Sequence, residues 1–194
     1  SELINSAKSK PVLTSLIINQ EKDQYLAKYI QELQHQSNGD MAVLEQKIAS
    51  TRIMGVHKRI GFAAHDGKKQ ELIECLKKHK NILLKHKLYG TGTTGLLIEK
   101  ELNVLVTRFQ SGSMGGDQQL GAKIATDELD ILIFLIDPLS PQAHDADVKA
   151  LLRLAEVYNI PCATTATAAD FILTSGMMEE LCIRQVSLTG YPKA

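Results

Sequence analysis

Asp117 is the acidic residue of this chain that is best placed to do chemistry. It lies in a glycine-rich segment, residues 111–121, whose four glycines permit positive φ angles or a close approach of the backbone to a ligand. Such a loop is typical of a small-molecule site, where a carboxylate can act as a general base and remove a proton. An aspartate that precedes a helix is also commonly its N-cap, so position alone leaves both roles open.

A second loop of small residues, residues 91–95, opens a predicted helix and favours phosphate binding. Hydroxyl groups, backbone N–H groups and the positive end of the helix dipole can meet one anion there. Gly90, Gly92 and Gly95 also fit the GxGxxG dinucleotide fingerprint, but the acid that it requires about 20 positions later is absent. The loop therefore favours a phosphomonoester over a dinucleotide. A plain strand-to-helix turn capped by Thr91 is the alternative.

Two histidines follow apolar runs and each precedes an aspartate, as His65-Asp66 and His144-Asp145. This arrangement permits a carboxylate to orient an imidazole. The two pairs lie far apart in the sequence and lack the HxH or HxxxH spacing of metal-binding histidines. We therefore predict no metal in this site.

Three further charged residues have both a functional and a structural interpretation. Lys69, in the first turn of a predicted helix, opposes the helix dipole, a cost that an anionic ligand would offset. It can equally be a solvated lysine. Asp137 and Asp147 fit either a site or the roles of a turn acid and a first-turn helix acid.

The pattern from residue 59 onward predicts the elements that carry these residues. Apolar runs alternate with helical patterns, as in βαβ units around a parallel sheet. The predicted strands are 59–64, 87–89, 103–107, 131–136 and 161–163, and the predicted helices are 68–79, 92–101, 118–125 and 147–158. We predict an α/β fold, a Rossmann-like three-layer sandwich with a mostly parallel five-stranded sheet and residues 131–136 at its centre. Ligands of such sheets bind beyond the carboxyl ends of the strands, where the polar loops should converge.

Residues 1–56 differ in kind and predict a helical extension ahead of an α/β domain at 57–194. Leu26, Tyr29, Ile30 and Leu33 form a helical apolar stripe, and residues 37–40 predict a turn. Asp40 should cap a second helix that begins at Met41. A packing arm is favoured over a partner site.

Composition narrows the classes of function. Lysine plus arginine and aspartate plus glutamate number 22 each, so no net field attracts nucleic acid or an anionic membrane. No apolar stretch is long enough for a membrane-spanning helix. The three cysteines match no zinc or redox motif, and we expect reduced, mostly buried thiols in a cytoplasmic protein.

Five segments together resemble the methylglyoxal synthase family, over about residues 58–174. They are His65-Asp66, the loop at 91–95, Ser111-Gly112 with the Gly-Gly-Asp-Gln-Gln run at 115–119, Asp137-Pro138-Leu139, and the run from His144 to Arg153. The resemblance implies a lyase that converts dihydroxyacetone phosphate to methylglyoxal and inorganic phosphate without a cofactor. It also implies a homohexamer or another multimer with active sites near subunit contacts. We further expect inhibition by inorganic phosphate, because this anion can occupy the Thr91 loop.

The resemblance implies a role for each site residue. Asp117 would be the base, and His144, supported by Asp147, the acid or electrophile at the carbonyl. The catalytic set would be completed by His65, Asp66 and Asp137. The phosphate would be bound by His65, Lys69, Thr91, Gly92, Thr93, Thr94, Ser111, Gly112 and His144.

The chain departs from the family pattern in three places. Ser113 stands where the family usually has proline, which should leave the loop before Asp117 more mobile. The family generally lacks the first 50-odd residues. Basic residues that the family tail brings to a neighbouring subunit are represented only by Arg184 or Lys193. Alternatives to the lyase are a sensing module that binds a phosphorylated effector and a dinucleotide-dependent oxidoreductase.

Overall fold

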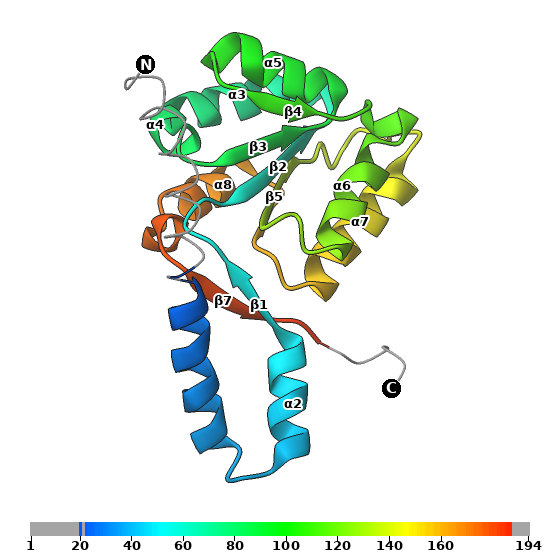
Figure 1. The fold of residues 1–194 in the computed structure, drawn as a ribbon. Helices are drawn as coiled ribbons and strands as arrows, with labels where there is room; N and C mark the ends of the chain where they lie inside the picture. The colour runs from blue at the N-terminus through cyan, green and yellow to red at the C-terminus, as the bar shows by residue number, and fades with distance from the viewer. Residues whose placement is uncertain (1–19, 21, 188–194) are drawn as a thin grey trace, which may run out of the picture.

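The computed structural model describes residue 20 and residues 22–187. Five parallel strands form the central sheet in the order β4-β3-β2-β5-β6. Their bounds are β2 (Arg59–Ala64), β3 (Lys87–Gly90), β4 (Val106–Arg108), β5 (Ile131–Leu135) and β6 (Cys162–Ala163). This sheet confirms the predicted α/β class (Figure 1).

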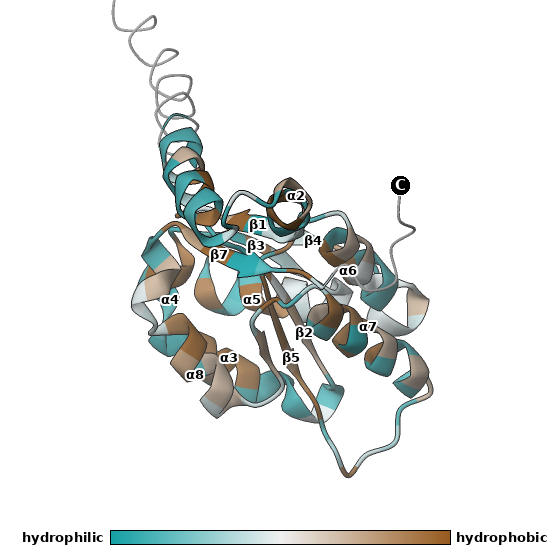
Figure 2. Ribbon diagram, turned by 90° about the horizontal axis from the view of Figure 1, so that it is seen from below, coloured by the Kyte–Doolittle hydropathy of each residue, from teal (hydrophilic) through white to brown (hydrophobic). Residues whose placement is uncertain are grey.

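Helices cover both faces of the sheet, giving three layers (Figure 2). One face packs against α3 (Lys69–Lys78), α5 (Gly92–Leu102) and α8 (Ala166–Leu173). The other face packs against α6 (Gly116–Ala125) and α7 (Asp145–Val157). Short helical segments complete the domain: α4 (Lys80–Leu83), η1 (Asp66–Lys68), η2 (Gly112–Met114) and η3 (Gly176–Glu179).

Strand β5 lies inside the sheet, between β2 and β6, as its all-apolar sequence predicts. All of its residues are buried, because Ile131, Ile133 and Leu135 face one helical layer while Leu132 and Phe134 face the other. A strand buried on both faces needs no polar alternation. Because β5 is packed on both faces, the position of its carboxyl end, and of the loop that follows it, is fixed.

Several predicted boundaries differ from the structure, among them the start of α7 at Asp145 instead of 147, and two of the differences have a local backbone reason. The strand predicted at 103–107 is β4 at Val106–Arg108, because α5 continues to Leu102 and Asn103 ends it in the left-handed conformation with φ 52°. Asparagine tolerates this conformation better than most residues. Helix α6 begins at Gly116, two residues earlier than predicted, after Gly115 with φ 104°.

The N-terminal segment holds two helices and also a strand that the sequence pattern did not reveal. Residues 22–36 and α2 (Met41–Ser50) are helical, and Asp40 caps α2 by accepting from the N–H groups of Ala42 and Val43, as predicted. Strand β1 (Thr51–Met54) pairs antiparallel with β7 (Cys182–Gln185). Residues 1–19 and 21 of the predicted extension lie outside the described residues, and for the rest the helical description is incomplete, since β1, which follows α2, pairs with β7 near the C-terminal end (Figure 1).

Arg184, one of the two candidates for a basic tail residue that reaches a neighbouring subunit, is buried in its own chain. Its side chain is 4% exposed, donates to the carbonyl of Tyr158, and pairs with Asp127 at 2.9 Å. It therefore holds β7 within its own chain, and these contacts do not favour Arg184 as the residue that reaches a neighbouring subunit. Lys193 lies outside the described residues.

Two further predictions concern the cysteines, expected to be mostly buried thiols, and the membrane-spanning helix, for which no apolar stretch is long enough. Cys75, Cys162 and Cys182 are free thiols, and two of the three are buried. Within residue 20 and residues 22–187, every helix is too short or too polar to cross a lipid bilayer.

Candidate functional site

A cavity of about 250 Å³ opens at the carboxyl ends of the strands. Ten of the thirteen predicted site residues line it: His65, Asp66, Lys69, Thr91, Thr93, Thr94, Ser111, Gly112, Asp117 and His144. They come from the segments that follow β2, β3, β4 and β5. The parallel sheet thus brings together loops that are up to roughly 80 residues apart in sequence. This agrees with the expectation that ligands of open α/β sheets bind beyond the carboxyl ends of the strands.

Asp117 is a buried carboxylate rather than a helix cap. It lies in the first turn of α6, whose N-cap is Gly115, and it is 1% exposed. Its Oδ2 has no hydrogen-bond partner among the described residues. The N-cap interpretation is therefore wrong, because helix α6 begins before Asp117. Burial raises the pKa of Asp117, the His144 and His65 rings lower it, and Asp147 raises it.

His144 faces Asp117 across a short gap. Its Nε2 lies 3.7 Å from Asp117 Oδ2, and 20% of the side chain is exposed. Gly112 closes one side of this pair: a Cβ on Gly112 would lie 3.0 and 3.1 Å from the two Asp117 oxygens and 3.1 Å from His144 Nε2. The absence of a side chain at Gly112 therefore leaves the space beside the carboxylate and the imidazole open.

His65 presents a hydrogen-bond donor to the cavity. Its Nδ1 accepts from the backbone N–H of Asp137 at 2.9 Å, so the ring proton is on Nε2. Nε2 is buried and has no partner in the described part of the chain. Phe134 packs edge to face on the ring, with centroids 5.5 Å apart, and fixes its orientation. His65 is thus a preset donor that lacks an acceptor.

Two predicted catalytic carboxylates do not line the cavity. Asp137 contributes its backbone N–H to His65, while its carboxylate accepts from the N–H of Leu139 at 3.2 Å in the turn after β5. Asp147 is half-buried in the first turn of α7 and acts on Asp117 through its charge. Neither carboxylate therefore lines the cavity in the structure.

The part of the cavity beside the N-terminus of α5 can bind an anion, in contrast to the part that holds the Asp117 carboxylate. Lys69 Nζ lies 2.6 Å from Asp66 Oδ1 and 2.7 Å from Thr93 Oγ1. Thr91 is the N-cap residue of α5 and its side chain makes no capping hydrogen bond. The first-turn N–H groups of a helix have no acceptor within it and attract anions. This end of the cavity can bind a phosphate.

Gly92 does not line the cavity but lets its two loops meet. Its N–H donates to the carbonyl of Gln110 at 2.9 Å, and a Cβ would lie 2.9 Å from the backbone nitrogen of Ser111. A side chain at this position would push the Ser111 loop away from the Thr91 loop. Gly92 therefore serves the site through backbone packing.

Five lining residues were not predicted: Ala63, Ala64, Ser113, Phe134 and Gln142. Ala63, Ala64 and Phe134 lie in strands, and in the sequence they resemble ordinary core residues. Gln142 stands two residues before His144 in a polar loop, which was the only signal that could have identified it.

Comparison with known proteins gives one consistent family. A family model described as an MGS-like domain matches residues 71–164. The chain is 57% identical over 122 residues to methylglyoxal synthase of Coxiella burnetii (strain RSA 493 / Nine Mile phase I), covering 63% of this chain and 85% of that protein. It is 56% identical over 118 residues to methylglyoxal synthase of Leptospira interrogans serogroup Icterohaemorrhagiae serovar Lai (strain 56601), covering 61% and 80%.

A solved structure agrees with these sequence matches. The crystal structure of methylglyoxal synthase from Elizabethkingia anophelis NUHP1 superposes with a TM-score of 0.68 at 48% identity. The match covers 71% of this chain and 91% of that chain. Because relatives of this identity are covered over more than two thirds of their length, the chain belongs to the methylglyoxal synthase family.

Proposed function

We propose that the protein is a methylglyoxal synthase, a lyase that converts dihydroxyacetone phosphate to methylglyoxal and inorganic phosphate. The observation that carries the proposal is the buried carboxylate of Asp117, whose Oδ2 has no hydrogen-bond partner among the described residues, in the same cavity as an anion site. A sensing module needs the anion site alone, whereas a buried carboxylate oxygen that makes no hydrogen bond costs stability and calls for a catalytic reason.

The first step is removal of a proton from the hydroxymethyl carbon beside the substrate carbonyl. Asp117 Oδ2 accepts that proton, and the electron pair moves to form an enediolate whose charge lies on the carbonyl oxygen. His65 Nε2–H and the His144 ring would donate hydrogen bonds to this oxygen. Asp137 would act by holding the His65 ring through its backbone N–H.

The second step breaks the carbon–oxygen bond to phosphate. The hydroxyl group of the enediolate gives its proton to the leaving phosphate and becomes an aldehyde, the double bond shifts, and the phosphate leaves with the electron pair of the carbon–oxygen bond. The resulting enolate takes a proton at the carbon that carried the phosphate and gives methylglyoxal. Lys69 and the Thr91 loop would hold the phosphate with its bond across the enediolate plane, the torsion that elimination requires.

Turnover with dihydroxyacetone phosphate in the presence of a chelator tests the proposal directly. Methylglyoxal and phosphate should appear in equal amounts and at equal rates. Binding of dihydroxyacetone phosphate without turnover would contradict the lyase and leave the sensing module.

The pH profile should report the raised pKa of Asp117. The base must be ionised, so kcat/KM should fall as pH drops through its pKa, and this acid limb should lie above the ordinary aspartate value of 3.8. The substrate phosphate also titrates near pH 6, roughly, so a variant must identify the limb. Asp147→Asn removes a charge that raises the pKa of Asp117 and should move the limb to lower pH.

Asp145→Asn is the matched control for that measurement. Asp145 lies in the same helical turn as Asp147, and its Oδ2 accepts from the N–H of Gln142 at 3.1 Å. Its variant should leave the limb in place. An identical limb in the wild type and in Asp147→Asn would show that a group other than Asp117 controls the acid side.

Inorganic phosphate should compete with the substrate, and the competition should depend on Lys69. Lys69→Met removes a charged hydrogen-bond donor from the anion site, so KM and the inhibition constant for phosphate should both rise about tenfold or more. Initial rates at several phosphate concentrations measure both constants. Lys68→Met is the control, because Lys68 Nζ pairs with Glu71 at 2.7 Å and does not line the cavity. Equal shifts in both variants would argue against the assigned anion site.

We further propose that the protein is a cytoplasmic homo-oligomer, with a hexamer suggested by the family resemblance. Support comes from two apolar side chains on the loops that carry Ser113 and Gln142: Met114 is 74% exposed and Leu139 is 92% exposed. Exposed apolar side chains are typical of surfaces that a second subunit covers. Light scattering of the full chain should give a mass several times 21.4 kDa, and a monomeric mass would refute the assembly.

A further inference from the structure

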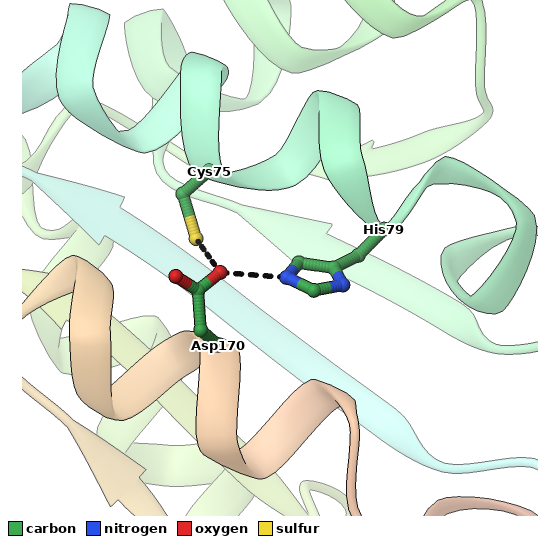
Figure 3. Close-up of side chains that lie close together, drawn as sticks. All are labelled: Cys75, His79 and Asp170. Atoms are coloured by element: carbon green, nitrogen blue, oxygen red, sulfur yellow. Dashed lines mark hydrogen bonds and ion pairs between the residues drawn. The ribbon is translucent and has the colours of Figure 1, made fainter.

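A cluster of three potential metal ligands lies between α3 and α8, away from the cavity (Figure 3). Cys75 lies on α3 and His79, four residues later, is the C-cap residue of that helix, while Asp170 projects from α8 toward both. Asp170 Oδ1 lies 2.6 Å from His79 Nε2 and 3.4 Å from Cys75 Sγ. The three ligand atoms lie within 4.8 Å of one another. None of these residues lines the catalytic cavity.

The donor set has a defined chemical preference. A thiolate, an imidazole nitrogen and a carboxylate oxygen are the three protein ligands that Zn²⁺ takes most often. With bonds of about 2.0 to 2.3 Å, tetrahedral ligand atoms are separated by roughly 3.3 to 3.7 Å. The sulfur–oxygen pair already has that separation, while His79 Nε2 and Asp170 Oδ1 would move apart by roughly 0.7 Å.

The burial of Cys75 and His79 and the contact of Lys78 with Asp170 favour the binding of one metal ion in this cluster. Cys75 is 2% exposed and the side chain of His79 is 10% exposed, so two ligands are held in the packed layer. Asp170 is 34% exposed, which leaves a fourth position accessible to water. Lys78 Nζ binds the other carboxylate oxygen, Oδ2, at 2.8 Å and leaves Oδ1 directed at the cluster. Metal-bound carboxylates commonly have such an outer partner.

We propose that Cys75, His79 and Asp170 bind Zn²⁺ with water as the fourth ligand. Binding displaces the thiol proton of Cys75 to solvent, and the neutral imidazole of His79 carries its one proton on Nδ1 instead of Nε2, so that a sulfur–zinc and a nitrogen–zinc bond replace two hydrogen bonds. The ion joins α3 to α8 on one face of the sheet. It stabilises the helix that begins with Lys69 and takes no part in the lyase reaction.

Without a metal, the same three residues form a hydrogen-bonded link between the two helices. Burial and the Asp170 hydrogen bond raise the pKa of the Cys75 thiol to about 11, so the metal-free thiol is protonated at neutral pH. Lys78 and His79 lower the pKa of Asp170 to about 2, which keeps its carboxylate ionised. The two forms therefore differ in a measurable property, the presence of a thiolate at neutral pH.

Cobalt titration of the full, chelator-treated chain tests the proposal, because Co²⁺ occupies zinc sites and is coloured. One equivalent should give a thiolate-to-cobalt charge-transfer band and intense visible bands of tetrahedral geometry. Zn²⁺ should abolish both bands stoichiometrically. Cys75→Ser should lose the charge-transfer band, and Asp170→Asn should weaken Co²⁺ binding at least about tenfold.

Cys162→Ser is the matched control, since Cys162 is a free, half-buried cysteine outside the cluster. It should keep both bands and the wild-type affinity. Circular dichroism of each variant shows whether it folds, and Asp170→Asn keeps the volume of the side chain if Cys75→Ser does not fold. Absence of the charge-transfer band in the wild type, or its persistence in Cys75→Ser, would overturn the proposal.

Discussion

Asp117→Asn is expected to lower kcat about 100- to 10,000-fold, the usual contribution of a positioned general base. The amide has nearly the shape of the carboxylate but cannot accept the substrate proton. Binding of phosphate should change little, because Lys69 and the Thr91 loop are intact. Parallel measurements of methylglyoxal release and of phosphate binding by calorimetry separate the two effects.

The same variant should be at least as stable as the wild type. The pKa of Asp117 is raised in the folded protein, so the folded state binds this proton more tightly than the unfolded state does. The linked stability is present at low pH and is lost as pH rises through the folded pKa. At neutral pH the buried charge is therefore a cost, which Asn removes. Thermal unfolding measures this effect.

Asp40→Asn is the control for Asp117→Asn, because asparagine is also a good N-cap and Asp40 caps α2 far along the chain from the cavity residues. It should keep full activity. Wild-type turnover in Asp117→Asn would remove Asp117 from the role of base. Loss of phosphate binding together with turnover would show that the site had rearranged.

Gly112→Ala is expected to reduce kcat/KM about 100-fold, because displacing reacting groups by as little as about 1 Å can cost that much. The added methyl group would stand 3.0 to 3.1 Å from both Asp117 oxygens and from His144 Nε2. The base and the imidazole must then separate, or the substrate carbon loses its place between them. Steady-state kinetics with dihydroxyacetone phosphate measure the loss.

Gly176→Ala is a closely matched control for this substitution. Gly112 and Gly176 are each the first residue of a short 3-10 helix, η2 and η3. A Cβ on Gly176 would meet no atom within 4 Å, so its variant should keep wild-type activity. The Gly112→Ala protein should unfold near the wild-type temperature, which would separate loss of geometry from loss of fold. Full activity in Gly112→Ala would contradict the tight packing over the catalytic pair.

The sequence alone was enough to predict the features that depend on neighbouring residues. The role of Asp40 as the N-cap of α2, in the turn after Gln36, could be predicted because a cap accepts hydrogen bonds from N–H groups only two and three residues away. The interior position of β5 was readable because its residues are apolar without alternation. The strand-end loops could be assigned to one edge because parallel strands point the same way.

Tertiary structure alone decided the features that depend on contacts between distant segments. Strand β1 has its hydrogen-bond partner about 130 residues away in β7, so no local period reveals it. Arg184 is a basic residue in sequence, yet its pairing with Asp127 holds it inside the molecule. Desolvation and partner choice arise only when the whole chain surrounds a group.

Asp117 shows both limits in one residue. The sequence identified it as a carboxylate in a glycine-rich loop typical of ligand sites, but the roles of helix cap and general base remained equally possible. The early start of α6 at Gly116 excludes the cap, and the packing around Asp117 leaves its Oδ2 buried and without a hydrogen-bond partner among the described residues. The residue type was determined by the sequence, whereas the raised pKa, which suits a base, comes from burial in the folded chain.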